Sequence, residues 1–181
     1  MTSRKLLIED MDRAEAAGIS CAGCAGTCCT FEANSMMVTP LEALELMSYL
    51  AKSGMKDEAL RSKLEETVRT YRLDHAPGNG KRSYLRKTYT CSFFGFKELG
   101  CPLPRNVKPY GCLAFNTHHK ELKAGEHCYS DKELLEKIVF DEKNAELKKQ
   151  YGIYWDKSPL PTALLDLWEK EISEKHLPSE F

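Results

Sequence analysis

The stretch of sequence that decides the fold runs from Thr39 to Gly54 and reads TPLEALELMSYLAKSG. Its start is typical of a helix N-terminus, because Thr39 can cap the helix, Pro40 suits the first helical position and Glu42 completes a capping box. Apolar residues then recur at helical spacing, and they are Leu41, Leu44, Leu46, Met47 and Leu50. A glycine such as Gly54 is typical of the residue that ends a helix. The stretch therefore predicts an amphipathic helix that buries one face in a core.

Helical spacing and capping residues predict four further helices on either side of this one. A second capping box joins Ser130 to Glu133, and Gly18 and Gly152 mark two of the helix ends. The predicted ranges are residues 4–17, 57–73, 130–152 and 162–175. We therefore expect a mainly α fold, in which a small helical domain carries one irregular insert.

The insert lies between residues 84 and 128, where prolines and glycines replace the helical pattern. A segment this long without regular structure is unusual in a compact domain, so something must hold it in place. Four of the eight cysteines of the chain fall in this segment, which favours a metal centre as the organiser. We expect a single domain over residues 1–181, with Cys-rich metal-binding segments at 18–34 and 84–128.

Composition and charge exclude several classes of protein. The 181 residues have a formal net charge of -1, so the chain lacks the positive field of a non-specific nucleic-acid binder. No apolar run approaches the roughly 20 residues that span a bilayer. The N-terminal residues include acids where an export signal needs an apolar stretch. We therefore expect a cytoplasmic protein without a membrane or nucleic-acid partner.

The first group of cysteines is the densest, with four in nine residues: Cys21, Cys24, Cys28 and Cys29. Two residues between the first pair allow a tight turn that points both sulfurs at one centre. The glycines and alanines between the cysteines let backbone N–H groups approach the sulfurs, where they stabilise thiolates. Because adjacent side chains diverge, Cys28 and Cys29 either serve two centres, or one binds a centre while the other packs.

The second group is widely spaced and contains Cys91, Cys101 and Cys112. Isolated cysteines are often core residues, but beside the first group these three become candidate distal ligands. Four nearby side chains are left open as further ligands, namely Cys128, His118, His119 and His127. The surrounding aromatic residues either shield a centre or form ordinary core, and they are Phe93, Phe94, Phe96, Tyr110 and Phe115.

An even number of cysteines also allows a disulfide framework. Disulfides need an oxidising compartment, and no export signal is visible in this sequence. A chain of this size can also build its own hydrophobic core without disulfide bonds. Clustered thiols in a reducing compartment are better explained as metal ligands or redox groups.

The cysteine order C-x2-C-x3-CC, C-x9-C and C-x10-C, with a Lys-Pro-x-x-Cys-x-x-Phe context at the end, resembles the YkgJ-type cysteine-cluster family. This family is described as a zinc- or iron-chelating domain. The resemblance implies seven ligand positions, which are Cys21, Cys24, Cys28, Cys29, Cys91, Cys101 and Cys112. Lys108 and Pro109 stand where the family often has Arg-Pro. A similar cysteine segment occurs in flagellin lysine methylases, where it is associated with a [4Fe-4S] cluster.

Ligation by thiolates alone selects zinc or iron–sulfur among the common metal centres. Zinc would favour two CxxC knuckles, and only one is present, whereas a [4Fe-4S] cluster tolerates widely spaced ligands. We therefore expect an iron–sulfur protein with a role in electron transfer, sensing or structure. A zinc-binding structural or interaction module and a metal-dependent enzyme of unknown substrate remain as alternatives. The partner, whether a protein or a small molecule, is not identified by the sequence.

Overall fold

The computed structural model describes residues 3–18, 26–75, 87–96, 100–116, 129–130, 141–170 and 172. Helices dominate this part of the chain, and they are α1 (Ser3–Ala16), α2 (Pro40–Lys52), α3 (Glu58–Tyr71), α4 (Tyr110–Ala114), α6 (Asp141–Tyr151) and α7 (Leu160–Glu169). Two short 3-10 turns accompany them, η1 (Thr27–Cys29) and η2 (Arg105–Val107). The predicted mainly α fold is confirmed.

Four short strands complete the described elements and form two antiparallel pairs. In one pair β1 (Met37–Val38) lies beside β4 (Ser158–Pro159), with Val38 opposite Ser158. In the other, β2 (Phe115–Asn116) lies beside β3 (Tyr129–Ser130), with Phe115 opposite Ser130. The first pair ties the start of α2 to the start of α7, because each strand closely precedes one of these helices.

Helix α2 begins as the sequence predicts. The Thr39 hydroxyl accepts a hydrogen bond from the Glu42 backbone N–H at 3.4 Å, and the Glu42 carboxylate accepts one from the Thr39 N–H at 2.8 Å. The helix ends at Lys52, and Gly54 follows with φ of 70°, a left-handed conformation that favours glycine. The capping box and the glycine stop are therefore both confirmed.

The other predicted helices agree with the structure to different degrees. Helices α1 and α3 match their predicted ranges to within two residues. Helix α7 begins at Leu160, two residues before the predicted start, since Pro161 suits its first turn. Ser130 is paired in β3, and Glu133, its predicted capping partner, lies outside the described residues. Gly152, with φ of 61°, follows α6 as predicted.

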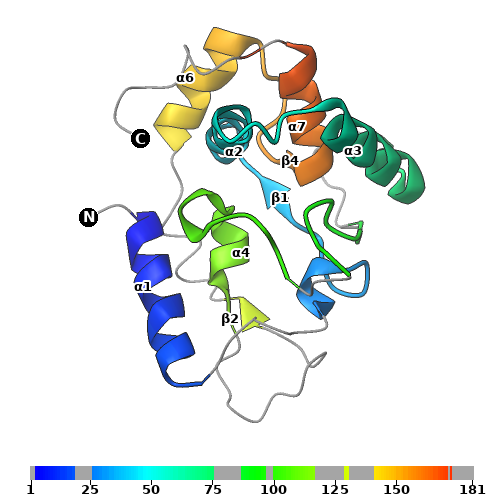
Figure 1. Ribbon diagram of the computed structural model, residues 1–181. Helices are drawn as coiled ribbons and strands as arrows, with labels where there is room; N and C mark the ends of the chain where they lie inside the picture. The colour runs from blue at the N-terminus through cyan, green and yellow to red at the C-terminus, as the bar shows by residue number, and fades with distance from the viewer. Residues whose placement is uncertain are drawn as a thin grey trace.

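The main core lies where α2, α3, α6 and α7 meet. Helix α2 packs on both α6 and α7, and α3 packs on α7 (Figure 1). The five apolar residues predicted for the buried face of α2 are all buried: Leu41, Leu44, Leu46, Met47 and Leu50. Burial of side chains of this size stabilises the fold by about 2 kcal/mol each.

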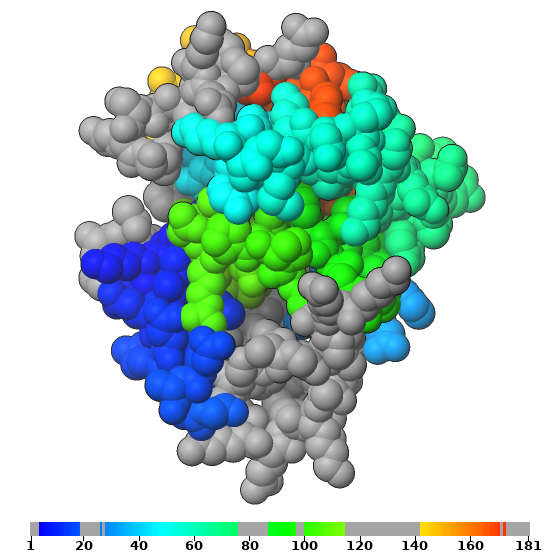
Figure 2. Space-filling model, in the orientation of Figure 1, coloured from blue at the N-terminus to red at the C-terminus, as the bar shows by residue number. Residues whose placement is uncertain are grey.

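A second, smaller apolar cluster holds α1 against α4. Its buried members are Leu7, Met11, Tyr110, Leu113 and Ala114. Residues 87–96 and 100–114, green in Figure 2, lie between α1 and the pair α2 and α3, so this described part of the cysteine-rich insert connects the two parts of the fold. Within the described ranges, no helix has the length and apolar character needed to cross a membrane.

Candidate metal centre

Five of the seven predicted ligand cysteines belong to the described part of the chain: Cys28, Cys29, Cys91, Cys101 and Cys112. Each of the five is half-buried, and none of them is in a disulfide bond. Cys21, Cys24, Cys128 and the three histidines proposed as further ligands lie outside the described residues. The structure therefore describes all three cysteines of the second group, but only Cys28 and Cys29 of the first group.

The two predicted cysteine segments lie side by side and are joined by backbone hydrogen bonds. The Cys91 N–H donates to the Cys29 carbonyl at 2.8 Å. Two residues earlier, the Tyr89 N–H donates to the Asn34 carbonyl at 2.9 Å. The Asn34 side-chain amide returns a bond to the Tyr89 carbonyl, also at 2.9 Å. Buried amides of this kind are satisfied only in one arrangement, so Asn34 fixes the register of the two segments.

Cys101 is brought to the same region by a second backbone contact. The Gly95 N–H donates to the Gly100 carbonyl at 3.0 Å, which closes the loop between Cys91 and Cys101. Both cysteines pack against the edge of the main core. The bridge between Gly95 and Gly100 thus brings Cys101 back toward the segment that carries Cys91.

Cys112 is positioned by α4, whose first turn is held from α2. The Cys112 N–H donates to the Pro109 carbonyl at 2.9 Å. The buried carboxylate of Glu42 accepts a hydrogen bond from the Tyr110 N–H at 2.9 Å, while it also caps α2. One side chain therefore aligns the start of α2 with the helix that carries Cys112.

Burial and the charges of neighbouring thiols raise the pKa values of two of these cysteines. Burial raises the pKa of Cys91 to about 11, and the charge of Cys101 contributes to this rise. Burial also raises the pKa of Cys112 well above its usual value, with additional contributions from the charges of Cys91, Cys101 and Cys28. Like charges act this way only at short range in a partly dry environment. Cys28, Cys91, Cys101 and Cys112 are named the thiol region below.

Backbone N–H groups and two lysines act in the opposite direction and lower the pKa values of these thiols. The backbone N–H groups of Phe93 and Phe94 donate toward the Cys91 sulfur and lower its pKa, as does the charge of Lys63. The charge of Lys108 lowers the pKa of Cys112. These are the groups expected around a thiolate, although burial outweighs them at both sulfurs.

The thiols do not form a ready coordination sphere in this conformation. Within the ranges that the structure describes, no three His, Cys, Asp or Glu side chains lie close enough together to hold a metal ion. The thiols therefore share a region and an environment, while their sulfur atoms remain apart. A metal held by the described cysteines alone requires side-chain rotation or a shift of the loops that carry them.

The aromatic residues divide between core and surface. Phe93 belongs to the main core and Phe94 is also buried, whereas Phe96 is 67% exposed and stacks edge-on against Phe94 at 5.0 Å. Tyr89 is buried and donates its hydroxyl to the Met36 carbonyl at 2.6 Å. Burial, together with the nearby charge of Cys91, raises the pKa of this phenol. Sequence reasoning missed the positioning roles of Asn34 and Tyr89, because both depend on partners more than 50 positions away.

The comparisons with known proteins add no relative. No protein-family profile matches the chain, and no curated protein or solved structure is significantly similar to it. The resemblance to the YkgJ-type family therefore rests on the spacing of the cysteines and on the Lys-Pro context of Cys112.

Proposed function

We propose that the protein binds a [4Fe-4S] cluster through cysteine thiolates and uses it in electron transfer, sensing or structure. The observation that supports this proposal is the pairing of the two cysteine segments, in which the Cys91 N–H donates to the Cys29 carbonyl at 2.8 Å. Charge effects among Cys28, Cys91, Cys101 and Cys112 accompany this pairing. The same observation supports membership of the YkgJ-type family as a proposal.

The donor set is soft, which suits an iron–sulfur cluster. Its members are thiols, and backbone N–H groups donate toward one of the sulfurs, as they do around such clusters. When bound, the cluster supplies a site that gains and loses single electrons. The chain supplies the ligands, the buried aromatic wall of Phe93 and Phe94 that excludes water, and the charges that set the potential.

Binding must draw the sulfurs together and remove their protons. The pKa of Cys91 is about 11, so this thiol holds its proton at neutral pH until a metal displaces it. A metal binds the thiolate, so cluster or metal uptake releases protons and strengthens as pH rises.

Zinc is the second candidate, because four thiols are the number that a closed tetrahedral zinc site takes. In that case zinc would be a structural metal ion, and its removal would unfold the insert. Either centre fits a reducing compartment, which keeps thiols available as ligands, so we place the protein in the cytoplasm as part of the proposal.

The test is metal analysis of protein purified without oxygen. An iron–sulfur protein is brown, absorbs at about 400 nm and contains iron and acid-labile sulfide in equal amounts. Stoichiometric zinc without sulfide would support the second candidate instead. Protein that holds neither metal after reconstitution with iron and sulfide, or with zinc, would contradict both.

A further inference from the structure

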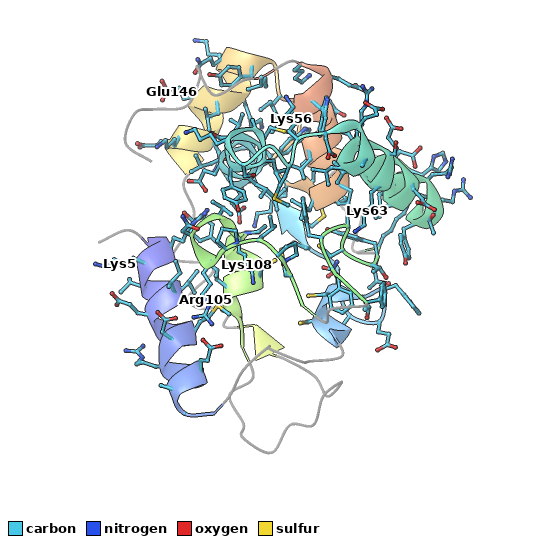
Figure 3. All side chains as sticks on the ribbon, in the orientation of Figure 1. Lys5, Lys56, Lys63, Arg105, Lys108 and Glu146 are labelled. Atoms are coloured by element: carbon cyan, nitrogen blue, oxygen red, sulfur yellow. The ribbon has the colours of Figure 1, made fainter. Side chains whose placement is uncertain are left out.

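A surface cavity of about 380 Å³ lies beside the second half of α3 and reaches α7. A cavity of this size can hold a small organic molecule. Lys63, labelled in Figure 3, lies in the first half of α3, so the cavity is found toward the opposite end of the helix. None of the described cysteines lines it. The side chains around it are both apolar and charged, and they include Val68, Arg69, Arg72, Asp74, His75 and Leu165.

The backbone of Arg72 is strained. This residue follows the last residue of α3 in a left-handed conformation, with φ of 51° and ψ of 46°. Among the described residues, it is the only one other than glycine that has a positive φ. Its N–H donates to the Arg69 carbonyl at 3.3 Å, and the Leu73 N–H donates to the Val68 carbonyl at 3.0 Å. Glycine usually occupies this position of such a helix end, and strain of this kind is typical of residues that hold a ligand.

The positive charges around the cavity are not used in ion pairs within the described part of the chain. No ion pair between described residues involves Arg69 or Arg72. The Glu65 carboxylate, which also lines the cavity, lies 3.1 Å from the Arg61 guanidinium. Asp74 is then the described carboxylate of the cavity that has no ion pair with another described residue. The two guanidinium groups therefore give the cavity a surplus of positive charge.

Lys87 removes an obstacle to anion binding at this end of α3. The carbonyl groups at the C-terminal end of a helix carry partial negative charge, which repels anions. The Lys87 ammonium group donates hydrogen bonds to the carbonyls of Arg72 and His75, directly after the helix. Its positive charge offsets the charge of these carbonyls, so an anion can approach the two guanidinium groups.

We propose that this cavity binds a small organic anion, with a phosphate or carboxylate group on an apolar body. Arg69 and Arg72 bind the oxygen atoms of the anion, because the planar guanidinium matches both carboxylate and phosphate. The half-buried Val68 and Leu165 supply the apolar surface on which the body of the ligand packs. This binding does not depend on the proposed metal centre.

The experiment titrates the full chain with phenyl phosphate, benzoate and methyl phosphate, and binding is followed in amide NMR spectra. Arg69→Met and Arg72→Gly each remove one guanidinium group, and Asp74→Asn removes the opposing negative charge. Arg13→Met is the matched control, because the Arg13 side chain lies on α1 and is 76% exposed. Urea unfolding measures the stability of each variant.

The wild-type chain should bind phenyl phosphate or benzoate saturably, and the tighter of the two identifies the anionic group. Methyl phosphate should bind more weakly than phenyl phosphate, because it lacks the apolar body. Arg69→Met and Arg72→Gly should each weaken binding at least about tenfold, since each removes charged hydrogen bonds. Asp74→Asn should strengthen binding about twofold. Arg72→Gly should keep or raise the urea midpoint, because glycine relieves the strained φ.

Three results would overturn the proposal. The first is a wild-type chain that binds neither phenyl phosphate nor benzoate. The second is equal binding by Arg69→Met, Arg72→Gly and Arg13→Met. The third is a lower urea midpoint for Arg72→Gly, which would show that the Arg72 side chain stabilises the fold and that its strain does not serve a ligand. Since none of these measurements requires a metal, failure of the proposed function would leave this inference standing.

Discussion

Gly26 lies directly against the aromatic ring of Phe94. A Cβ atom at Gly26 would lie 2.3 Å from the Cε2 and Cζ atoms of that ring, closer than any real contact. The φ angle of Gly26 is 76°, a left-handed conformation that side chains disfavour. The Gly26 carbonyl also accepts the Cys29 N–H at 2.7 Å. This glycine therefore lets the first cysteine segment approach the loop that follows Cys91.

Gly26→Ala should destabilise the protein by about 2 to 4 kcal/mol, since it adds a backbone penalty and displaces the Phe94 ring. Gly18→Ala is the matched control, because Gly18 has φ of 83° and a methyl group added there would meet nothing within 4 Å. It should cost only the backbone penalty, about 1 kcal/mol. Urea unfolding measures both. Equal losses of stability in Gly26→Ala and Gly18→Ala would show that the contact between Gly26 and Phe94 does not contribute to stability.

Glu42→Gln should also destabilise the protein, because the Glu42 carboxylate accepts hydrogen bonds from two backbone N–H groups, those of Thr39 and Tyr110. An amide has a single acceptor oxygen, so its NH2 group must face one of these donors. An unmatched buried donor costs about 1 to 3 kcal/mol. The exposed Glu66 on α3 supplies the control, and Glu66→Gln should leave the urea midpoint within error of the wild type. A Glu42→Gln midpoint equal to that of the control would contradict the role of Glu42 at α4.

The features that the sequence predicted well are local. The cap at Thr39, the apolar face of α2 and the glycine stop after it depend on residues within a few turns of one another, and all are present. The expectation of an irregular segment between 84 and 128 also follows from local composition, and its described part contains only short elements.

The features that sequence alone could not predict depend on distant partners. Asn34 looks like a turn residue, and its role emerges only when Tyr89 is beside it. Glu42 reads as a capping residue, and its second bond depends on Tyr110, 68 positions away. Ser130 fits a helix cap by pattern, and its pairing with Phe115 in the strand pair β2 and β3 is a further contact that the local pattern does not reveal. In each case the long-range contact decides the role.

Serine variants test which cysteines serve the proposed centre. Replacing Cys28, Cys91, Cys101 or Cys112 should each lower metal loading at least about tenfold, because a hydroxyl is a poor substitute for a thiolate. Cys29→Ser decides between the roles left open for the adjacent pair, because reduced loading would make Cys29 a ligand as well and full loading would make it a packing residue. Iron, sulfide and zinc per chain are the measurements. If Cys91→Ser and Cys112→Ser both load metal fully, the thiol region is not the metal-binding site.

Arg4 and Glu45 join α1 to α2 in a partly buried ion pair. Their side chains are 11% and 9% exposed. The Arg4 guanidinium also donates to the Asn106 carbonyl at 2.6 Å and lies 4.7 Å from the centroid of the Tyr110 ring. Burial raises the pKa of Glu45, and the charge of Arg4 only partly offsets this rise.

Arg4→Met should therefore destabilise the protein in a pH-dependent way. Without Arg4, the buried Glu45 carboxylate keeps only the weaker opposing charge of Lys143 and its pKa rises further, which costs about 3 kcal/mol at about pH 7. A raised pKa in the folded state means that the folded protein holds the proton more tightly, so stability falls as pH rises from the unfolded pKa through the folded pKa. The loss caused by Arg4→Met should consequently be smaller at about pH 4, where Glu45 is protonated, than at about pH 7. Urea unfolding of the variant and the wild type at both pH values measures the difference.

Two further variants separate the charge effect from lost packing. Arg4→Met with Glu45→Gln has no carboxylate at position 45, so the pH-dependent part of the loss that Glu45 causes should disappear, while the part due to Asn106 and Tyr110 remains. Arg13→Met is the control on the same helix, because the Arg13 side chain is 76% exposed and its pair with Asp10 should contribute less than about 0.5 kcal/mol. A loss from Arg4→Met that is the same at both pH values would show that the desolvated charge of Glu45 does not limit the stability of the contact between α1 and α2.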